Sequence, residues 1–279
     1  MIDALADLWQ FQFIRHAVMA GLLASVACGI IGTFVVVKRI VFLSGGISHS
    51  AYGGIGLGYF LGFNPILGAI AFSLAAALGI AWVRRKASQR EDTLIGAMWA
   101  VGMAIGILLI DKTPGYAPNL MSYLFGNILT VPTSDLVLIG SLDLLILATV
   151  FLLFKEFKAL TFDEEYAAIS GVPVAILNIV LFCLVALTVV VLIRAVGIIL
   201  VIALLTLPAA ILVQFDLSLE KTAVGAVLLG IVFTISGLAL SAIFNITSGA
   251  TIIMVACAGY LLSMPARALI AKSKGRAIN

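Results

Sequence analysis

The sequence predicts an all-α membrane protein, a polytopic bundle of eight or nine transmembrane helices, from three observations. Of its 279 residues 63% are hydrophobic and only 10% are charged, and its mean hydropathy is +1.25. Soluble domains are about 45–50% apolar and about 25% charged, so a soluble globule of this length could not cover so much apolar surface. The apolar residues form continuous runs of about 20 residues, the length of a membrane-spanning helix. Continuous runs also exclude a β-barrel, whose strands alternate apolar and polar residues.

Nine apolar runs predict nine helices that cross the bilayer in turn. They lie at residues 12–37, 47–63, 65–83, 94–111, 135–154, 172–193, 196–213, 222–244 and 248–264. Residues 1–279 then form a single transmembrane domain. The second run is short and rich in glycine, and if it is re-entrant the number of spans falls to eight. The spacing of Gly54, Gly58 and Gly62 in this run predicts close packing of helix backbones.

The positions of Lys and Arg predict the orientation. If the N-terminus lies outside, nine spans leave the C-terminus in the cytoplasm, in a multi-pass protein of the cytoplasmic membrane. Of the 16 basic residues, all but Arg15, Lys112 and Arg194 then fall in cytoplasmic segments, as the positive-inside rule requires. The net charge of +3 is therefore explained by basic residues beside the membrane lipid on the cytoplasmic side. No nucleic-acid partner is needed to explain it.

Polar residues inside the bundle are candidates for function, because each is costly in a membrane. Residues 41–54 combine serines, including Ser48, with the paired glycines Gly45 and Gly46, which would loosen the helix, and with His49. A neutral imidazole binds zinc, manganese or iron. The alternative is a structural His49 that is hydrogen-bonded to a backbone carbonyl where the helix starts.

Asp143 lies deep in the fifth apolar run. Its carboxylate must face the bundle interior or water, or be protonated. A role in a transport pathway and a role as a structural partner remain equal alternatives. Arg194 and Asn178 are weaker candidates, since Arg194 can reach the outer interface and Asn178 can bridge two helices.

Two polar breaks between the runs are candidate docking surfaces. Residues 111–119 would lie outside, either as a surface for an external partner or as a plain connector. In the cytoplasmic break, Thr161 or Asp163 can cap a helix with an acidic first turn, and Gly171 can end it. The resulting helix, at about residues 162–171, is too short to be stable alone, so we expect it to dock against another protein. The alternative is a solvated loop.

Motifs of common enzymes are missing from the sequence. It has no G-x-x-x-x-G-K-[ST] phosphate loop, no H-E-x-x-H and no G-x-S-x-G. The chain is therefore predicted not to be an enzyme and not to hydrolyse ATP by itself. An intramembrane hydrolase would rest on the serines beside His49, which lack a third orienting group.

Four segments, in this order and spacing, carry a resemblance that runs from Gly21 to about Met264. They are a basic residue before Phe42-Leu43 together with Ile47-Ser48-His49, then Tyr123 to Leu129, then Phe162 to Glu165 with Ser170 to Val172, and finally Val196 to Leu200 with Ala203 to Ala210, which contains Pro208. They resemble the permease subunits of the zinc/manganese/iron-type metal-ion ABC importers.

The resemblance implies a homodimeric permease with a central pathway, fed by an extracytoplasmic metal-binding protein and driven by two copies of a cytoplasmic ATP-binding subunit. The metal is then the transported substrate, and no cofactor is held permanently. His49 matches the histidine of the metal path. The element that fits into a cleft of the ATPase matches Phe162, Asp163, Glu164, Glu165 and Gly171. Many members carry an aspartate four residues before the histidine, where this chain has Gly45, and losing that hard ligand slightly favours zinc over manganese.

The leading hypothesis is therefore ATP-driven import of a divalent transition-metal ion, zinc first, with manganese or iron as alternatives. A second hypothesis is an ion-coupled secondary transporter or channel that uses Asp143 and His49 without an ATPase subunit.

Overall fold

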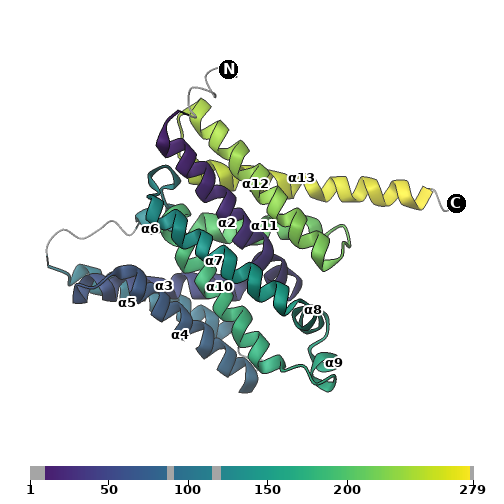
Figure 1. Ribbon diagram of the computed structural model, residues 1–279, viewed down its shortest axis with the longest axis horizontal. Coiled ribbons are helices and arrows are strands. Elements are labelled where there is room, and N and C mark those ends of the chain that lie inside the picture. Colours follow the sequence, from purple (N-terminus) through teal and green to yellow (C-terminus); the bar gives the residue numbers. More distant parts are fainter. Residues whose placement is uncertain (1–9, 87–90, 115–120, 277–279) are drawn as a thin grey trace.

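All regular elements in the described part of the chain are helices (Figure 1). The computed structural model describes residues 10–86, 91–114 and 121–276. The long helices are α2 (Gln12–Val37), α3 (Val41–Leu61), α4 (Pro65–Lys86), α5 (Glu91–Asp111), α7 (Thr133–Leu152), α10 (Val174–Val196), α11 (Ile198–Val213), α12 (Leu219–Phe244) and α13 (Ser248–Arg276). The short elements are α6 (Met121–Phe125), the 3-10 turn η2 (Ile128–Thr130), α8 (Phe154–Phe162) and α9 (Glu164–Ile169). The all-α prediction is confirmed.

Seven helices in the described ranges are long and apolar enough to cross a membrane, namely α2, α4, α5, α7, α10, α12 and α13. Helix α11 is apolar but has only 16 residues. Helix α3 is not among the seven, because serines, glycines and His49 dilute its apolar residues. With 21 residues it is still about 30 Å long, enough to cross. It tolerates this composition because residues 43–56 are all buried in protein rather than exposed to lipid.

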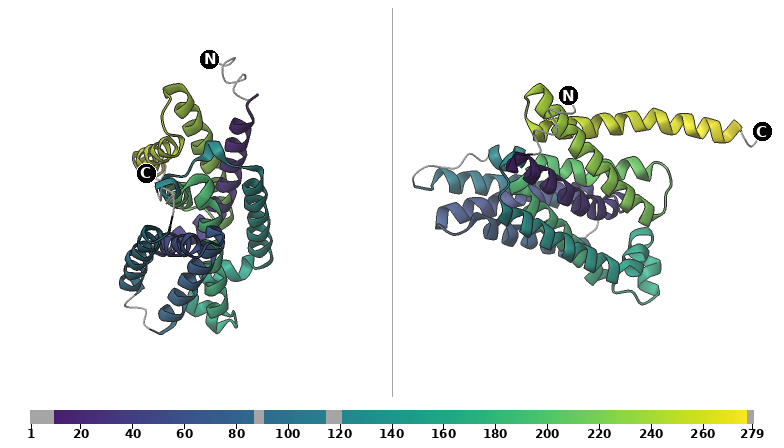
Figure 2. Two further views of the ribbon diagram at one scale, coloured as in Figure 1. Left: turned by 90° about the vertical axis from the view of Figure 1, so that its left-hand side faces the viewer. Right: turned by 45° about the horizontal axis from the view of Figure 1, so that its top comes forward.

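Two helix boundaries differ from the predicted ones by six residues or more. Helix α3 begins at Val41, six residues before the predicted start, and continues unbroken through Gly45 and Gly46. The paired glycines do not loosen it, because α5 packs directly against them. Helix α13 continues to Arg276 with Pro265 inside it, and projects from the body of the molecule (Figures 1 and 2). Most of the predicted outer segment, residues 115–119, lies outside the described residues.

Glycines let α3 approach its two neighbours until backbones touch. A Cβ atom on Gly54 would collide with the backbone of Gly68 on α4, and one on Gly56 would collide with the backbone of Gly106 on α5. Helix α3 is thus clamped between α4 and α5, which confirms the predicted close packing at Gly54. Gly62 instead ends the helix, in a left-handed conformation with φ of 72°.

The other half of the bundle is built around α2, which packs against α12, α11 and α7. Its buried face consists largely of small residues, which bring these helices close together. The outer face of α7 exposes large apolar side chains such as Leu144 and Phe151. In a membrane such a face meets lipid, so its exposure carries no hydrophobic penalty.

Contacts between helix ends define the two ends of the bundle. At one end of the bundle, Glu164 of α9 contacts the end of α2, the end of α4 and the start of α10. At the other end, Arg194 near the end of α10 pairs with Asp135 near the start of α7. We call these the Glu164 end and the Arg194 end.

Candidate functional site

His49 is held on α3 by two contacts that determine its orientation. Its Nδ1 lies 2.9 Å from the carbonyl oxygen of Gly45, one turn earlier. A carbonyl can only accept, so Nδ1 carries the proton and the neutral ring keeps its lone pair on Nε2. The imidazole also stacks on the indole of Trp99 from α5, with ring centroids 3.9 Å apart and planes 20° from parallel. His49 is therefore both hydrogen-bonded to a carbonyl, as one alternative expected, and able to present one nitrogen to a cation.

The serines of α3 are engaged within their own helix. Ser44, Ser48 and Ser50 donate to carbonyl oxygens three or four residues earlier, at 2.7, 2.6 and 2.8 Å. His49 uses Nδ1 on a backbone carbonyl rather than on a hydroxyl. The arrangement gives no support to a serine nucleophile activated by His49, because the base and the hydroxyls are not paired.

Asp143 lies in a different part of the bundle from His49. It is buried on α7, and within the described residues neither carboxylate oxygen has a hydrogen-bond partner. Helix α7 packs against α2, α8 and α10, whereas the helix of His49 packs mainly against α5 and α4. Pro208 is buried inside α11, which packs against α2 and α13. The described residues contain no cluster of three or more His, Cys, Asp or Glu that could hold a metal.

A sharp corner between α8 and α9 forms the predicted cytoplasmic element. Phe162 is the last residue of α8, so the predicted single helix at about 162–171 is in fact the end of one helix and the short α9, Glu164–Ile169. Asp163 separates the two helices because its backbone is extended. Its side chain accepts a hydrogen bond from the amide of Tyr166 at 2.9 Å and so caps the N-terminus of α9. Gly171, with φ of 82°, follows the end of α9. Of the two predicted caps, Asp163 is the one used.

The outer face of this corner exposes large apolar side chains. Phe162 is 64% exposed, Tyr166 is 66% exposed and Ile169 is 87% exposed. The corner differs from the outer face of α7, because α9 is a short helix with polar caps that joins the short α8 to the long α10 (Figure 1). Apolar groups gathered at such a place are typical of a protein contact surface.

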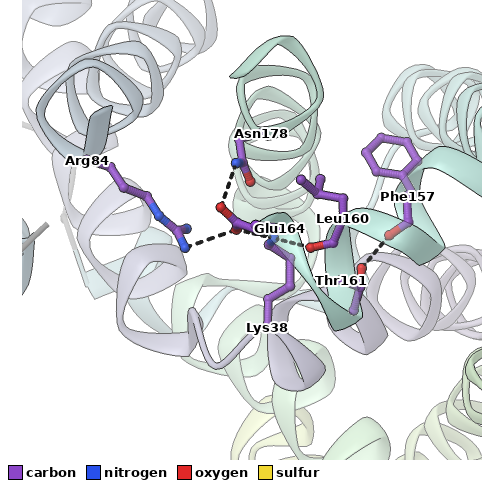
Figure 3. Close-up of polar contacts among 7 residues, drawn as sticks. All are labelled: Lys38, Arg84, Phe157, Leu160, Thr161, Glu164 and Asn178. Carbon is purple, nitrogen blue, oxygen red and sulfur yellow. Dashed lines mark hydrogen bonds and ion pairs between the residues drawn. The ribbon is translucent and has the colours of Figure 1, made fainter. Parts of the chain in front are cut away.

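Glu164 faces the opposite way, into the bundle (Figure 3). Its Oε1 accepts from Lys38, directly after α2, at 2.7 Å and from Arg84 of α4 at 3.3 Å. Its Oε2 accepts from Asn178 of α10 at 3.5 Å. Lys38 also donates to the carbonyl oxygen of Leu160 at 3.0 Å. One carboxylate thus ties α9 to three long helices, and Asn178 bridges helices as the sequence suggested.

The charge of Glu164 is stabilised by this network. Burial by itself raises the pKa of the Glu164 carboxyl, but the hydrogen bond from Lys38 and the positive charges of Lys38 and Arg84 outweigh it, so the pKa lies below its ordinary value of 4.5. Lys38 depends on this carboxylate, because its side chain is only 2% exposed. The sequence marked Lys38 and Arg84 only as basic residues, since the contacts join segments some 80 to 126 positions apart.

Two of the segments that carried the resemblance meet at the Arg194 end. Gly126 and Gly197, both with positive φ, lie so close that a Cβ on either would collide with the backbone around the other. Beside them the hydroxyls of Tyr59 and Tyr123 are hydrogen-bonded at 2.9 Å, and Arg194 pairs with Asp135 at 3.3 Å. These contacts join α3, α6, α7, α10 and α11, so both segments have a structural function.

A helical membrane bundle with a buried imidazole and a small exposed corner helix defines the class as a membrane transport subunit, and comparison with known proteins identifies the family. Residues 10–267 match the ABC 3 transport family, and the chain belongs to it. It is a metal-type ABC transporter permease, a non-catalytic membrane component, as the resemblance implied.

Individual relatives agree with this assignment. The chain is 54% identical to an uncharacterized membrane protein of Synechocystis sp., over 96% of this chain and 95% of the relative. It is 35% identical to the manganese transport system membrane protein MntC of Listeria monocytogenes, over 90% of each chain. The structure of PsaBC from Streptococcus pneumoniae in complex with Fab contains a similar fold, with a TM-score of 0.84, 30% identity, and coverage of 94% of this chain and 95% of that chain.

Proposed function

We propose that this permease forms the translocation pathway of an importer that moves a divalent transition-metal ion across the cytoplasmic membrane. Zinc is the first candidate, because His49 is an imidazole ligand with no carboxylate one turn before it. The manganese transport relative makes manganese the main alternative, and iron is another. The metal is the substrate, and the chain needs no resident cofactor for this role.

The observation that carries the proposal is the corner formed by α8 and α9. It exposes Phe162, Tyr166 and Ile169 outward, while Glu164 holds it against three long helices. A partner that moved this corner would therefore move the ends of α2, α4 and α10. Such a device suits a permease whose energy comes from ATP hydrolysed by another subunit. Phe162, Asp163, Glu164, Glu165 and Gly171 together constitute the coupling element.

The proposed assembly is a homodimer of this chain with two copies of a cytoplasmic ATP-binding subunit and one extracytoplasmic metal-binding protein. The Glu164 end faces the cytoplasm, as does the C-terminus, because most basic residues then obey the positive-inside rule. The pathway passes His49, with Gly45, Gly46 and Ser48 shaping the helix around it. Asp143 and Pro208 are further pathway candidates.

Phe162→Ala tests the coupling element. The variant should insert into the membrane normally but lose co-purification with the ATP-binding subunit, because the aromatic anchor of the contact is removed. Deleting residues 162–171 should act likewise, although it also removes Glu164. Phe151→Ala, which changes an even more exposed phenylalanine on the outer face of α7, should co-purify normally. Unchanged co-purification of Phe162→Ala would count against the coupling role.

One observation favours the second hypothesis, an ion-coupled transporter that works alone. Asp143 is a buried carboxyl without a partner in the described residues, which suits a proton or ion site. That hypothesis requires the isolated chain to transport under an ion gradient, and Asp143→Asn to abolish the transport.

A further inference from the structure

Trp99 makes three contacts with one face of α3, and one of them is with His49 itself. Its indole stacks on the imidazole of His49 and lies over Gly45. It also packs against the ring of Phe42, with the two ring centroids 6.0 Å apart. Residues 42, 45 and 49 follow one another at spacings of three and four, so they form one stripe along the helix. A single indole from α5 therefore contacts all three positions of the stripe.

The stack leaves the metal-binding edge of the imidazole usable. A ring nitrogen binds a cation in the plane of the ring, whereas Trp99 covers one face. The hydrogen bond from Nδ1 to Gly45 fixes one edge, and the indole fixes the plane. Nε2 is then held in one direction, in the way that groups around a metal ligand orient it in many proteins.

The indole also occupies the space where a second ligand would stand. A Cβ atom on residue 45 would lie 2.9 Å from a ring carbon of Trp99, so no side chain fits there while the indole keeps its place. A carboxylate at this position would lie one turn before His49 on the same face, near enough to share a cation with it. Trp99 and Gly45 thus exclude a hard oxygen ligand from the site.

We infer that Trp99 is a positioning and specificity-determining residue of the metal pathway. By orienting His49 and keeping position 45 empty, it makes the site favour a cation that prefers imidazole, such as zinc, over one that prefers carboxylate oxygens, such as manganese. The inference rests on the proposed function and extends it to selectivity.

The test compares zinc and manganese uptake, in competition, by the complete assembly in proteoliposomes. Trp99→Phe keeps an aromatic ring over His49. Trp99→Leu places an apolar side chain there that cannot stack on the imidazole. We expect the phenylalanine variant to keep the zinc preference, and the leucine variant to lose about tenfold in zinc uptake. Leu108→Ala, an exposed position on the same helix, should match the wild type. Equal uptake and equal zinc-to-manganese ratios in the phenylalanine and leucine variants would overturn the inference.

A double variant tests the exclusion of the oxygen ligand. Gly45→Asp alone should lower uptake of both metals, because the new side chain collides with the indole. Combined with Trp99→Ala, it should raise manganese uptake relative to zinc about tenfold or more above either single variant. If the manganese-to-zinc uptake ratio of the double variant changes only by the product of the changes in the two single variants, then residue 45 and the indole do not compete for the same space.

A fluorescence titration separates this inference from the proposed function. The chain has three tryptophans, so Trp9→Phe with Trp82→Phe leaves Trp99 as the only reporter. Zinc added to this purified double variant of the permease should change the indole emission, and His49→Ala should abolish the change. A wild-type assembly that transports no metal would overturn the proposed function, whereas the absence of any zinc-dependent emission change would overturn the role of Trp99.

Discussion

Single residues in this protein have functions that depend on partners far away in the sequence. His49 could be singled out from the sequence because its imidazole, a side chain that can bind metal ions, lies in an apolar run. Trp99, which stacks on it, could not, since an aromatic residue in such a run is usually a packing residue. Glu164 was predicted within the coupling element, and the structure adds that it holds the element to the bundle rather than facing outward.

Glu164→Gln should destabilise the permease by about 1–3 kcal/mol at neutral pH, because the buried Lys38 loses its carboxylate partner. Since the pKa of Glu164 is lower in the folded protein than its ordinary 4.5, its stabilising effect is complete above that value and lost as the pH falls through the folded-state pKa. Unfolding midpoints of the detergent-solubilised protein at pH 7 and below pH 4.5 measure both effects.

The matched control is Glu165→Gln, which makes the same change at the next residue, whose side chain is exposed. Its midpoint should equal that of the wild type at both pH values. Equal midpoints for Glu164→Gln and the wild type at pH 7 would show that the network around Glu164 adds nothing to stability.

At the scale of elements, the apolar runs predicted the positions of the long helices within a few residues at most boundaries. The exceptions are instructive. Helix α3 starts earlier than predicted because α5 packs on Gly45 and Gly46 and holds that stretch helical. The glycines and serines of the stretch do not by themselves predict a helix, so this contact could not be foreseen from the sequence. The corner at Asp163 divides the predicted coupling helix, because one side chain caps the second helix locally.

Gly54→Ala tests the clamp on α3. Even one methyl group would collide with the backbone of Gly68, and a backbone cannot move aside as a flexible side chain can. We expect the free energy of unfolding to fall by about 1–3 kcal/mol. The variant should show a lower unfolding midpoint and be less monodisperse in size-exclusion chromatography.

Gly79→Ala on α4 is the corresponding control, since nothing lies within 4 Å of the added methyl group. It should leave the midpoint unchanged or raise it, because alanine favours a helix over glycine by about 0.5–1 kcal/mol. A Gly54→Ala protein as stable as Gly79→Ala would refute close backbone packing between α3 and α4.

At the scale of the whole molecule, the two ends of the bundle have different roles. At the Arg194 end, Gly126 and Gly197 lock short segments against each other. At the Glu164 end, one carboxylate links the corner helix to α2, α4 and α10. Because Lys38 lies just before α3, which carries His49, a movement of α9 has a path through packed structure to His49, the proposed metal ligand.

This arrangement predicts that the isolated chain does not transport. Proteoliposomes with this chain alone should show no zinc or manganese accumulation under an ion gradient, since in the proposed function the energy comes from ATP hydrolysed by another subunit. Adding the ATP-binding subunit, ATP and the metal-binding protein should start uptake. His49→Ala should then lower uptake without lowering protein abundance. Accumulation by the isolated chain would instead support the ion-coupled alternative.

The sequence by itself determined that this protein is an α-helical membrane bundle and where its helices lie, and it marked the imidazole and the acidic corner as candidate places for function. Each of these follows from local composition, because the bilayer imposes one length and one polarity on every span. Only the tertiary structure decided what those residues touch. The stack of Trp99 on His49, the clamp at Gly54 and the network of Glu164 all join segments distant in sequence, and their contacts depend on how the helices pack.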